Sequence, residues 1–278
     1  MLTSIQLREE DNTTILSLPV GTPSSSTGMF LKNVDGLGAV KADISVSSFA
    51  SYDGGLYQSS RAGVRNIVMT VGLDLRYDYE NDVSTLRDRL YSAFPPKSSA
   101  MLVFISDNFR GGNAATRKIH GIVESVEPVI FSKEPEVQIS ILCPRPYFES
   151  YSSYSIVGGT GVPLDTSLFG TAPAGFLFDM VLPNVAYDLT LETEFDEPLR
   201  FEWDMKVGDR VRISTVSGNK FVRLTPAGQT ASISALDGIV SGPMNMSLDR
   251  RTKSFIVNRL TGIDNPYTIH YTPEYVGL

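Results

Sequence analysis

The clearest alternation of apolar and polar positions lies in residues 136–143, where every second residue is apolar: Val137, Ile139, Ile141 and Cys143. A period of two is expected when one face of a β-strand is buried and the other meets solvent. Residues 119–131 are rich in β-branched side chains, and the polar stretch 132–136 can turn the chain. The pattern therefore predicts a long hairpin in the middle of the chain.

Two prolines directly after this hairpin, Pro144 and Pro146, indicate where regular structure stops. Proline has no backbone donor for a sheet, and it holds the residue before it in an extended conformation. We therefore expect a first domain over residues 1–148 and a second domain over residues 149–278. A chain of 278 residues is long enough for two domains that each bury a core.

One stretch, residues 78–94, has the spacing of a helix, with an apolar stripe at intervals of three and four: Val83, Leu86, Leu90 and Phe94. Asp78 or Asn81 is expected to cap its start, and Asp82 lies near the positive end of the helix dipole. A helix with one apolar stripe buries that stripe, and the neighbouring strands supply the surface for it. The first domain is therefore predicted to be a β-sandwich with a single packed helix.

Residues 48–63 form the longest gap in the apolar pattern of the first half, and they are rich in glycine, serine and tyrosine. Long loops inside compact domains are usually functional or mobile. Two interpretations stand side by side. The segment is either an exposed hairpin tip or an arm that packs on a neighbouring subunit through Tyr52, Leu56 and Tyr57.

The second half shows no further helical spacing, and short strands recur between turn residues, which is typical of an antiparallel β-sandwich. The predicted strands cover residues 176–182, 185–193, 199–205, 210–216, 220–225, 230–236, 254–260 and 267–272. The single tryptophan, Trp203, lies in the third of these strands, between apolar alternates. We expect it in the core, and a sugar-binding platform is the alternative.

Three stretches carry a resemblance to a known family. They are the strand Ile-x-Gly-Ile-Val-Glu-Ser from Ile119, the sequence Ile-Ser-Ile-Leu-Cys-Pro-Arg-Pro-Tyr-Phe that ends at Phe148, and the end of the chain from Tyr267. The first two resemble the domain boundary of siphophage distal tail proteins, the Dit family of phage tail components. The third resembles the closing strand of their second domains, and residues 48–63 hold the position of their extended arm.

The resemblance implies a structural protein of the virion tail tip that carries no cofactor. Six first domains would form a ring between the tail tube protein and the tail-tip or baseplate proteins, with a channel for DNA. The second domains would be galectin-like sandwiches outside the ring, where adhesion components such as a receptor-binding protein attach. Assembly would take place in the host cytoplasm.

Charge and candidate chemistry agree with a structural role. The net charge of −7 disfavours tight binding to a phosphate backbone, although DNA can slide past such a surface. His120, His270 and Cys143 are too few for a His/Cys metal cluster, and the single cysteine allows no internal disulfide. We expect no metal site and no membrane span, and no signal peptide at the amino terminus.

Two other functions stay open. The second sandwich could be a carbohydrate-binding module for host recognition, with Trp203 as its platform. An enzyme acting on sugars would need two carboxylates at a fixed separation, and the acidic stretch from Glu192 to Asp204 contains candidates. Such clusters are more often solvated strand faces and turns.

Overall fold

The computed structural model describes residues 1–23, 27–49, 53–77, 82–107, 115–129, 134–159, 162, 164, 170–194, 196–252, 255–258 and 266–278. The chain divides into two compact units. The first contains residues 1–151 together with the last three residues, 276–278, and the second contains residues 152–275. Each unit is described by itself.

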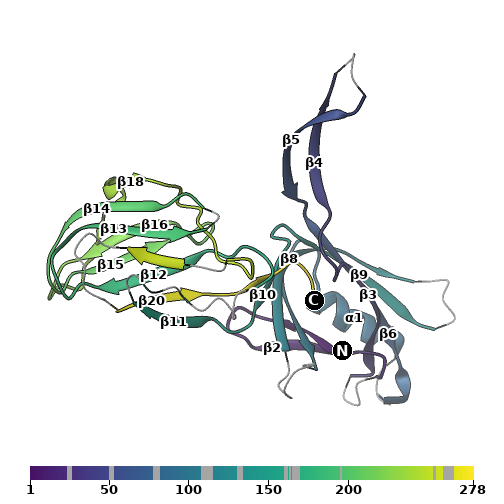
Figure 1. The fold of residues 1–278 in the computed structure, drawn as a ribbon. Helices are drawn as coiled ribbons and strands as arrows, with labels where there is room; N and C mark the ends of the chain where they lie inside the picture. Colours follow the sequence, from purple (N-terminus) through teal and green to yellow (C-terminus); the bar gives the residue numbers. More distant parts are fainter. Residues whose placement is uncertain are drawn as a thin grey trace. The chain divides into compact units, whose positions relative to one another are not determined.

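The first unit is built around one antiparallel sheet in the order β2-β1-β7-β8-β9-β6-β3, and β10 also pairs with β8 (Figure 1). The strands are β1 (Leu2–Arg8), β2 (Thr14–Pro19), β3 (Met29–Asp35), β6 (Arg65–Leu73), β7 (Ser99–Ser106), β8 (Ala115–Pro128), β9 (Glu136–Cys143) and β10 (Phe148–Ser150). The predicted central hairpin is β8–β9, in which Val123 pairs with Ile141 and Val126 with Ile139.

One face of this sheet forms the core of the unit, because the alternating apolar residues of neighbouring strands come into register there. Ile67 pairs with Ile141 and Met69 with Ile139 between β6 and β9. All four side chains are fully buried. Each large apolar side chain removed from water contributes about 1.5–3 kcal/mol, so burial of this shared face stabilises the unit.

The only α-helix in the part of the chain that the structure describes is α1 (Val83–Ala93), preceded by the short 3₁₀ turn η1 (Leu75–Tyr77). Asp82 is the residue that caps α1, because its side chain accepts a hydrogen bond from the Thr85 backbone N–H at 2.8 Å. The expected caps, Asp78 and Asn81, lie outside the described residues. Leu86 and Leu90 are fully buried, so the apolar stripe packs into the core as predicted.

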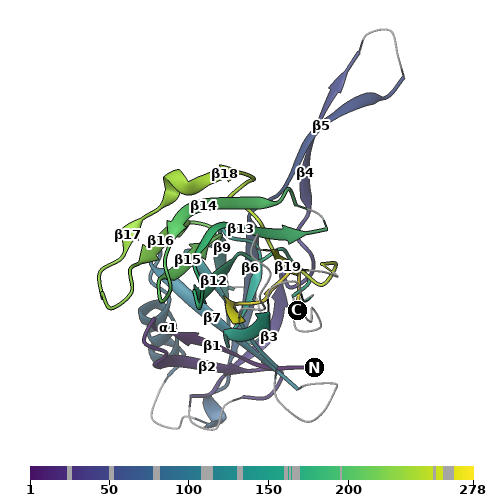
Figure 2. The ribbon, with the colours of Figure 1, turned by 60° about the vertical axis from the view of Figure 1, so that its left-hand side comes forward.

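The hairpin β4 (Ala42–Ser48) with β5 (Gly55–Ala62) extends away from the rest of the first unit, and its two strands pair only with each other (Figures 1 and 2). We call this hairpin the arm. Within residues 48–63, the segment expected to be a hairpin tip or an arm, residues 55–62 form a strand that was not predicted. All eight residues of this strand are exposed, so its sequence lacks the apolar alternation that predicts a half-buried strand.

The second unit contains two antiparallel sheets, in the orders β11-β20-β12-β15-β16-β17 and β18-β14-β13-β19. The strands are β11 (Tyr154–Gly159), β12 (Phe176–Val181), β13 (Ala186–Thr193), β14 (Leu199–Met205), β15 (Arg210–Ser214), β16 (Phe221–Thr225), β17 (Ile233–Ser234), β18 (Ile239–Ser241), β19 (Phe255–Asn258) and β20 (Pro266–Tyr271). The short β21 (Glu274–Tyr275) belongs to neither of these sheets. Side chains from both sheets share one core, including Phe178, Phe201 and Phe255. The unit is therefore a β-sandwich.

The predicted strand over residues 230–236 is mostly wrong. Only Ile233–Ser234 is extended, and the 3₁₀ turn η2 (Leu236–Gly238) follows. Ile233 is exposed, so this edge segment has little apolar surface with which to stabilise a longer strand. The mainly β, two-domain fold class is nevertheless confirmed. No helix among the described residues is long and apolar enough to cross a membrane.

Candidate assembly surfaces

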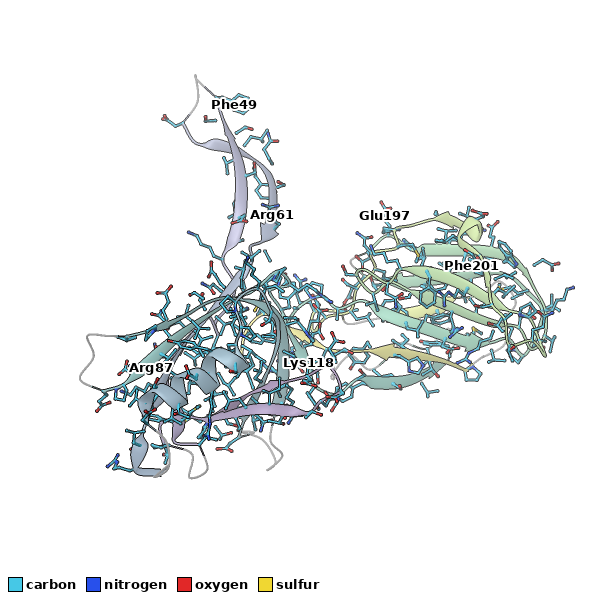
Figure 3. The ribbon with its side chains drawn as sticks, turned by 180° about the vertical axis from the view of Figure 1, so that it is seen from behind. Phe49, Arg61, Arg87, Lys118, Glu197 and Phe201 are labelled. Carbon is cyan, nitrogen blue, oxygen red and sulfur yellow. The ribbon has the colours of Figure 1, made fainter. Side chains whose placement is uncertain are left out.

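The two faces of the arm differ in polarity. Ile44 pairs with Ser60 and Val46 with Tyr57, and these positions share one face because side chains alternate along each strand. Ile44, Val46 and Tyr57 are 62%, 57% and 60% exposed. The other face carries the Asp43–Arg61 ion pair at 3.5 Å and a run of serines, and Figure 3 labels Arg61 along the arm and Phe49 near its end. The arm is therefore an amphipathic hairpin whose apolar face is uncovered.

Of the three residues expected to make subunit contacts, the structure places two. Tyr57 belongs to the apolar face, and its hydroxyl lies 2.7 Å from the Ser60 hydroxyl. Leu56 is opposite Ser47 and points to the polar face. Tyr52 lies outside the described residues. Sequence reasoning missed Ile44 and Val46, although their alternation with Ser45 and Ser47 was a visible signal.

A buried arginine holds the chain in place where it enters and leaves the arm. The Arg65 guanidinium donates to the carbonyls of Gly36, of Gly38 at 2.7 Å, of Pro146 at 2.6 Å and of Val276 at 2.7 Å. It also lies 4.4 Å from the ring centre of Phe148. Burial lowers the pKa of Arg65. The bonds tie the turn before β4 to the end of the chain, so the root of the arm is fixed to the unit.

Cys143 belongs to this same buried region. Burial raises the pKa of its thiol to about 11, and the nearby charge of Arg65 opposes that effect only in part. The thiol is therefore protonated at neutral pH and is a poor nucleophile. This cysteine acts as a small core residue.

The sheet face opposite the core of the first unit is open and largely polar. Glu127 pairs with Gln138 across β8 and β9, and both are exposed. The Ser140 hydroxyl lies 2.7 Å from a Glu124 carboxylate oxygen. Glu136 also points to this side, where its carboxylate meets the Lys32 ammonium at 2.5 Å. Carboxylates therefore outnumber cations among these residues, and the same face also carries the Lys118–Glu149 ion pair and the exposed Ile122 and Leu142.

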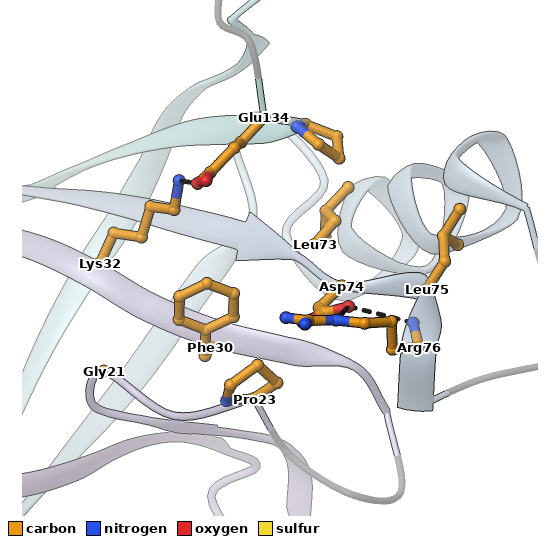
Figure 4. Close-up of a pocket in the computed structure, with 10 residues that line it drawn as sticks. Gly21, Pro23, Phe30, Lys32, Leu73, Asp74, Leu75, Arg76 and Glu134 are labelled. Atoms are coloured by element: carbon orange, nitrogen blue, oxygen red, sulfur yellow. Dashed lines mark hydrogen bonds and ion pairs between the residues drawn. The ribbon is translucent and has the colours of Figure 1, made fainter.

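One end of this face carries a depression of about 440 Å³ (Figure 4). Phe30, Leu73 and Pro135 supply apolar lining, and two ion-paired groups flank them. Lys32 bonds Glu134 and Glu136, and Arg76 contacts Asp74 at 2.6 Å. The hydrogen bonds from Arg76 lower the pKa of Asp74, so its carboxylate stays ionised. Each of these charged groups is in an ion pair. The depression therefore suits an apolar protein segment better than a reactive substrate.

In the second unit, Trp203 packs against the core instead of standing free. Its ring stacks on Phe201 with centroids 6.3 Å apart and planes 4° from parallel. A Cβ added to Gly238 would come within 2.8 Å of the Trp203 ring, so the ring lies directly over that glycine. The indole is half buried and packs against the core on the side of Phe201, as expected from the apolar alternation of this strand.

The acidic stretch 192–204 lies along a strand face and a turn. Arg200 contacts Asp188 at 3.0 Å and Glu202 at 2.7 Å, which balances part of the charge. The Asp196 carboxylate accepts hydrogen bonds from Thr193 and from the Ser247 backbone, as an acid in a turn does. Among the described residues, no three His, Cys, Asp or Glu side chains converge as metal ligands.

The two histidines are in different units. His120 is exposed on β8. His270 lies on β20, where its Nδ1 is 2.7 Å from the Ser155 hydroxyl. A serine nucleophile also requires an acid that orients the imidazole through its other nitrogen. No described residue makes that bond to His270, so the contact is a cross-strand polar pair.

The described chain is a β-rich protein of two units with a projecting hairpin, and its fold is similar to that of solved structures. The SPP1 Dit protein, a hub of the adsorption apparatus in phages that infect Gram-positive bacteria, is similar over 99% of both chains, with a TM-score of 0.63 and 12% identity. Two structures of the phage P2 baseplate in its activated conformation, with Ca and with Sr, give TM-scores of 0.44 and 0.43 at 8% identity, over 100% of this chain and 100% and 99% of theirs.

No protein-family model and no curated protein matches the sequence. The similarity to the SPP1 Dit protein extends over both units and is therefore a likeness of the whole fold. The chain has the fold of a distal tail protein, as the resemblance in its sequence indicated.

Proposed function

We propose that this chain is a structural subunit of a phage tail tip, in which identical copies form a ring that joins the tail tube to the distal tail and adhesion proteins. The whole-length likeness to the SPP1 Dit protein supports this role. The uncovered apolar face of the arm, made by Ile44, Val46 and Tyr57, is the observation that carries the proposal.

The arm is the part of the molecule that most needs a partner. A hairpin of two strands is marginally stable by itself in water, and burial of its apolar face supplies what is missing. Each of Ile44, Val46 and Tyr57 contributes about 1.5–3 kcal/mol when it moves from solvent into an apolar contact. A second copy of the chain is the partner, because every copy presents the same arm and the same body.

Contact between the arm of one copy and the body of the next is a head-to-tail interface. Such interfaces close into rings when the rotation between neighbours allows it. Six copies is the number that the family resemblance implies, and we propose a homohexamer. Each interface then buries the arm of one subunit and a matching patch of the next, at a size of about 800 Å² on each partner.

The open face of the first unit is the proposed lining of the channel. Its described residues include Glu124, Glu127 and Glu136, with Lys32 beside Glu136 and Lys118 beside Glu149. Like charge repels the phosphates of DNA and prevents tight binding. DNA would therefore pass through the ring without specific contacts.

The remaining partners follow from the proposed position in the virion. The first domain, residues 1–148, would contact the tail tube protein and the tail-tip hub or baseplate proteins. The second domain, residues 149–278, would be peripheral and available to a receptor-binding protein. Assembly would take place in the host cytoplasm, and no catalytic step is assigned to the chain.

The decisive experiment compares the arm faces. The variant Ile44→Ser with Val46→Ser removes two apolar side chains from each proposed interface. The binding free energy should fall by about 3–6 kcal/mol, and the association constant by about a hundredfold or more. Mass photometry of the wild-type protein, alone and with its tail tube protein, is expected to show hexamers. The variant is expected to remain monomeric.

The matched control changes the opposite face. Ser45→Thr with Ser59→Thr alters two residues that face each other across the same hairpin and keeps both polar. This control should assemble like the wild type. A wild-type chain that stays monomeric in the presence of its tail tube protein, or a double serine variant that forms normal rings, would contradict the proposal.

A further inference from the structure

The outer face of the six-stranded sheet in the second unit carries three arginines on two neighbouring strands. Phe176, Phe178 and Met180 of β12 are buried, so the alternate residues of that strand point outward. Asp179 pairs with Arg212 of β15 across this outer face, and Val181 pairs with Arg210. Arg223 of β16 is on the same face, and Figure 2 shows β15 and β16 side by side.

Arg212 and Arg223 are direct cross-strand partners. Side chains in such a position have Cβ atoms about 5 Å apart, and like charges there destabilise a sheet. Nothing in the fold requires arginine at either position, since both point away from the core. Two arginines opposite each other can hold one anion between them, because guanidinium groups bind carboxylate and phosphate through charge-assisted hydrogen bonds.

The nearby acid does not neutralise this pair. Asp179 is engaged by Arg210 through two hydrogen bonds, Nε to Oδ1 at 2.7 Å and Nη2 to Oδ2 at 2.5 Å. The Nε of Arg212 is buried and has no hydrogen-bond partner among the described residues. The guanidinium of Arg223 lies 4.4 Å from the ring centre of Phe221, which holds it in place without neutralising it.

The two sheets of this unit have outer faces of opposite charge. On the four-stranded sheet, Arg200 is flanked by Asp188 and Glu202, and acids are in excess. The arginine face is therefore a local feature, and it stands out in a chain with a net charge of −7.

Neutral polar side chains continue the arginine face across the sheet. Thr268 is next to Asp179 in the register, and the neighbouring row contains the Ser155–His270 pair. These groups donate and accept hydrogen bonds without adding a fixed negative charge. The face thus combines the arginine pair with hydroxyl and imidazole groups, and the apolar Leu177 and Val157 lie between and beside them.

We propose that this face binds an anionic glycan, with a phosphate, sulfate or carboxylate group held between Arg212 and Arg223. Hydroxyl groups of the sugar would bond to Thr268 and the Ser155–His270 pair. A continuous polyanion such as DNA is disfavoured, because the remainder of the chain repels it. The inference concerns the second domain alone and holds whether or not the first domain forms a ring.

The test measures binding of the full chain to three polymers with one backbone: dextran sulfate, carboxymethyl dextran and neutral dextran. Biolayer interferometry should detect one or both of the charged polymers, with affinity that falls as salt rises, and no binding of neutral dextran. Comparison of dextran sulfate with carboxymethyl dextran shows whether the site prefers a sulfate or a carboxylate. A short DNA duplex is the competing probe, and it is expected to bind at least about tenfold more weakly than the better charged dextran.

Arg212→Gln and Arg223→Gln are each expected to weaken binding by about tenfold to a hundredfold, because each removes charged hydrogen bonds to the anion. Arg250→Gln is the matched control. This exposed arginine changes the net charge by the same amount and belongs to neither strand. It should alter affinity by less than about twofold, and thermal melts check that all three variants are folded.

Several results would overturn the inference: no binding to either charged dextran, DNA bound as tightly as the dextrans, or an equal loss in Arg250→Gln. If Arg212→Gln does not fold, the exposed Arg223 decides the matter alone. Mass photometry on the same samples should show unchanged assembly in each variant, so that a failure of this site is separate from a failure of the ring.

Discussion

Two antiparallel hairpins of the first unit have the same local structure and opposite environments. In β8–β9, Val123 pairs with Ile141 on a face that is fully covered. In the arm, Val46 pairs with Tyr57 on a face that is more than half exposed. Both hairpins alternate apolar and polar residues over part of their length. Only in the first hairpin is the apolar face buried by other residues of the same chain.

The difference shows what alternation by itself determines. A period of two decides which side chains share a face, and the surrounding elements decide whether that face is buried. Strands β6 and β7 flank β8–β9 in the same sheet, and the buried Leu86 and Leu90 of α1 belong to the core of the same unit. No described element of the first unit covers the arm, whose two strands pair only with each other. The proposed contact with a second copy of the chain rests on this difference.

The sharpest test of this comparison exchanges one isoleucine for alanine in each hairpin. Ile141→Ala should lower the free energy of unfolding of the first unit by about 2–5 kcal/mol, because the side chain is fully buried and leaves a cavity. Ile44→Ala should change it by less than about 0.5 kcal/mol, because that side chain is exposed in the monomer.

Amide hydrogen exchange of β8 and β9 in increasing urea is the suitable measurement, since the single Trp203 reports on the second unit. The Ile44→Ala protein should still show weaker assembly than the wild type. Equal destabilisation of the isolated chain by both substitutions would mean that the apolar face of the arm is covered within the monomer.

The second test concerns the root of the arm. Arg65→Met removes a donor to four carbonyls and replaces it with an apolar side chain of similar length. An unpaired carbonyl costs about 1–3 kcal/mol where water cannot reach it. Gly36, Gly38 and Val276 are exposed, so water replaces part of the lost bonds, and a total loss of about 1–3 kcal/mol is expected. The Gly63 N–H donates a hydrogen bond to the Lys41 carbonyl at the start of the arm, and its hydrogen-exchange rate should also rise.

Arg76→Met is the control for this test. The Arg76 side chain is 84% exposed and pairs with Asp74 at the surface, so its loss should cost less than about 1 kcal/mol. If Arg65→Met proved no more destabilising than Arg76→Met, the buried guanidinium would not be what holds the root of the arm.

Much of this fold is predictable from the sequence, because burial and alternation coincide there. The strand β14 and the central β9 follow the apolar pattern, and so does α1. The prediction fails where a strand buries little: β5 is exposed throughout, and Ile239–Ser241 in β18 is a short edge strand. The return of the last three residues to the first unit depends on bonds from Arg65 and Arg117, which no local pattern reveals.

The candidate surfaces were less accessible to prediction than the fold. Tyr57 was identified because aromatic residues are conspicuous in a polar segment, while Leu56 beside it points to the other face. The pairing of Arg212 with Arg223 depends on the register between β15 and β16 and on the turn at Gly218 that sets it. The two residues are eleven positions apart, and only the hairpin makes them neighbours.

The smallest expected effect tests the polar face of the arm. Arg61→Gln removes the ion pair with Asp43, whose side chains are 84% and 61% exposed. Solvent screens such a pair, and its net contribution is less than about 0.5 kcal/mol, so both the stability of the monomer and ring assembly should be unchanged. Assembly would be measured by mass photometry at low and high salt. A large loss of rings in this variant would show that the neighbouring copy contacts the polar face as well, and the arm would then be buried on both sides.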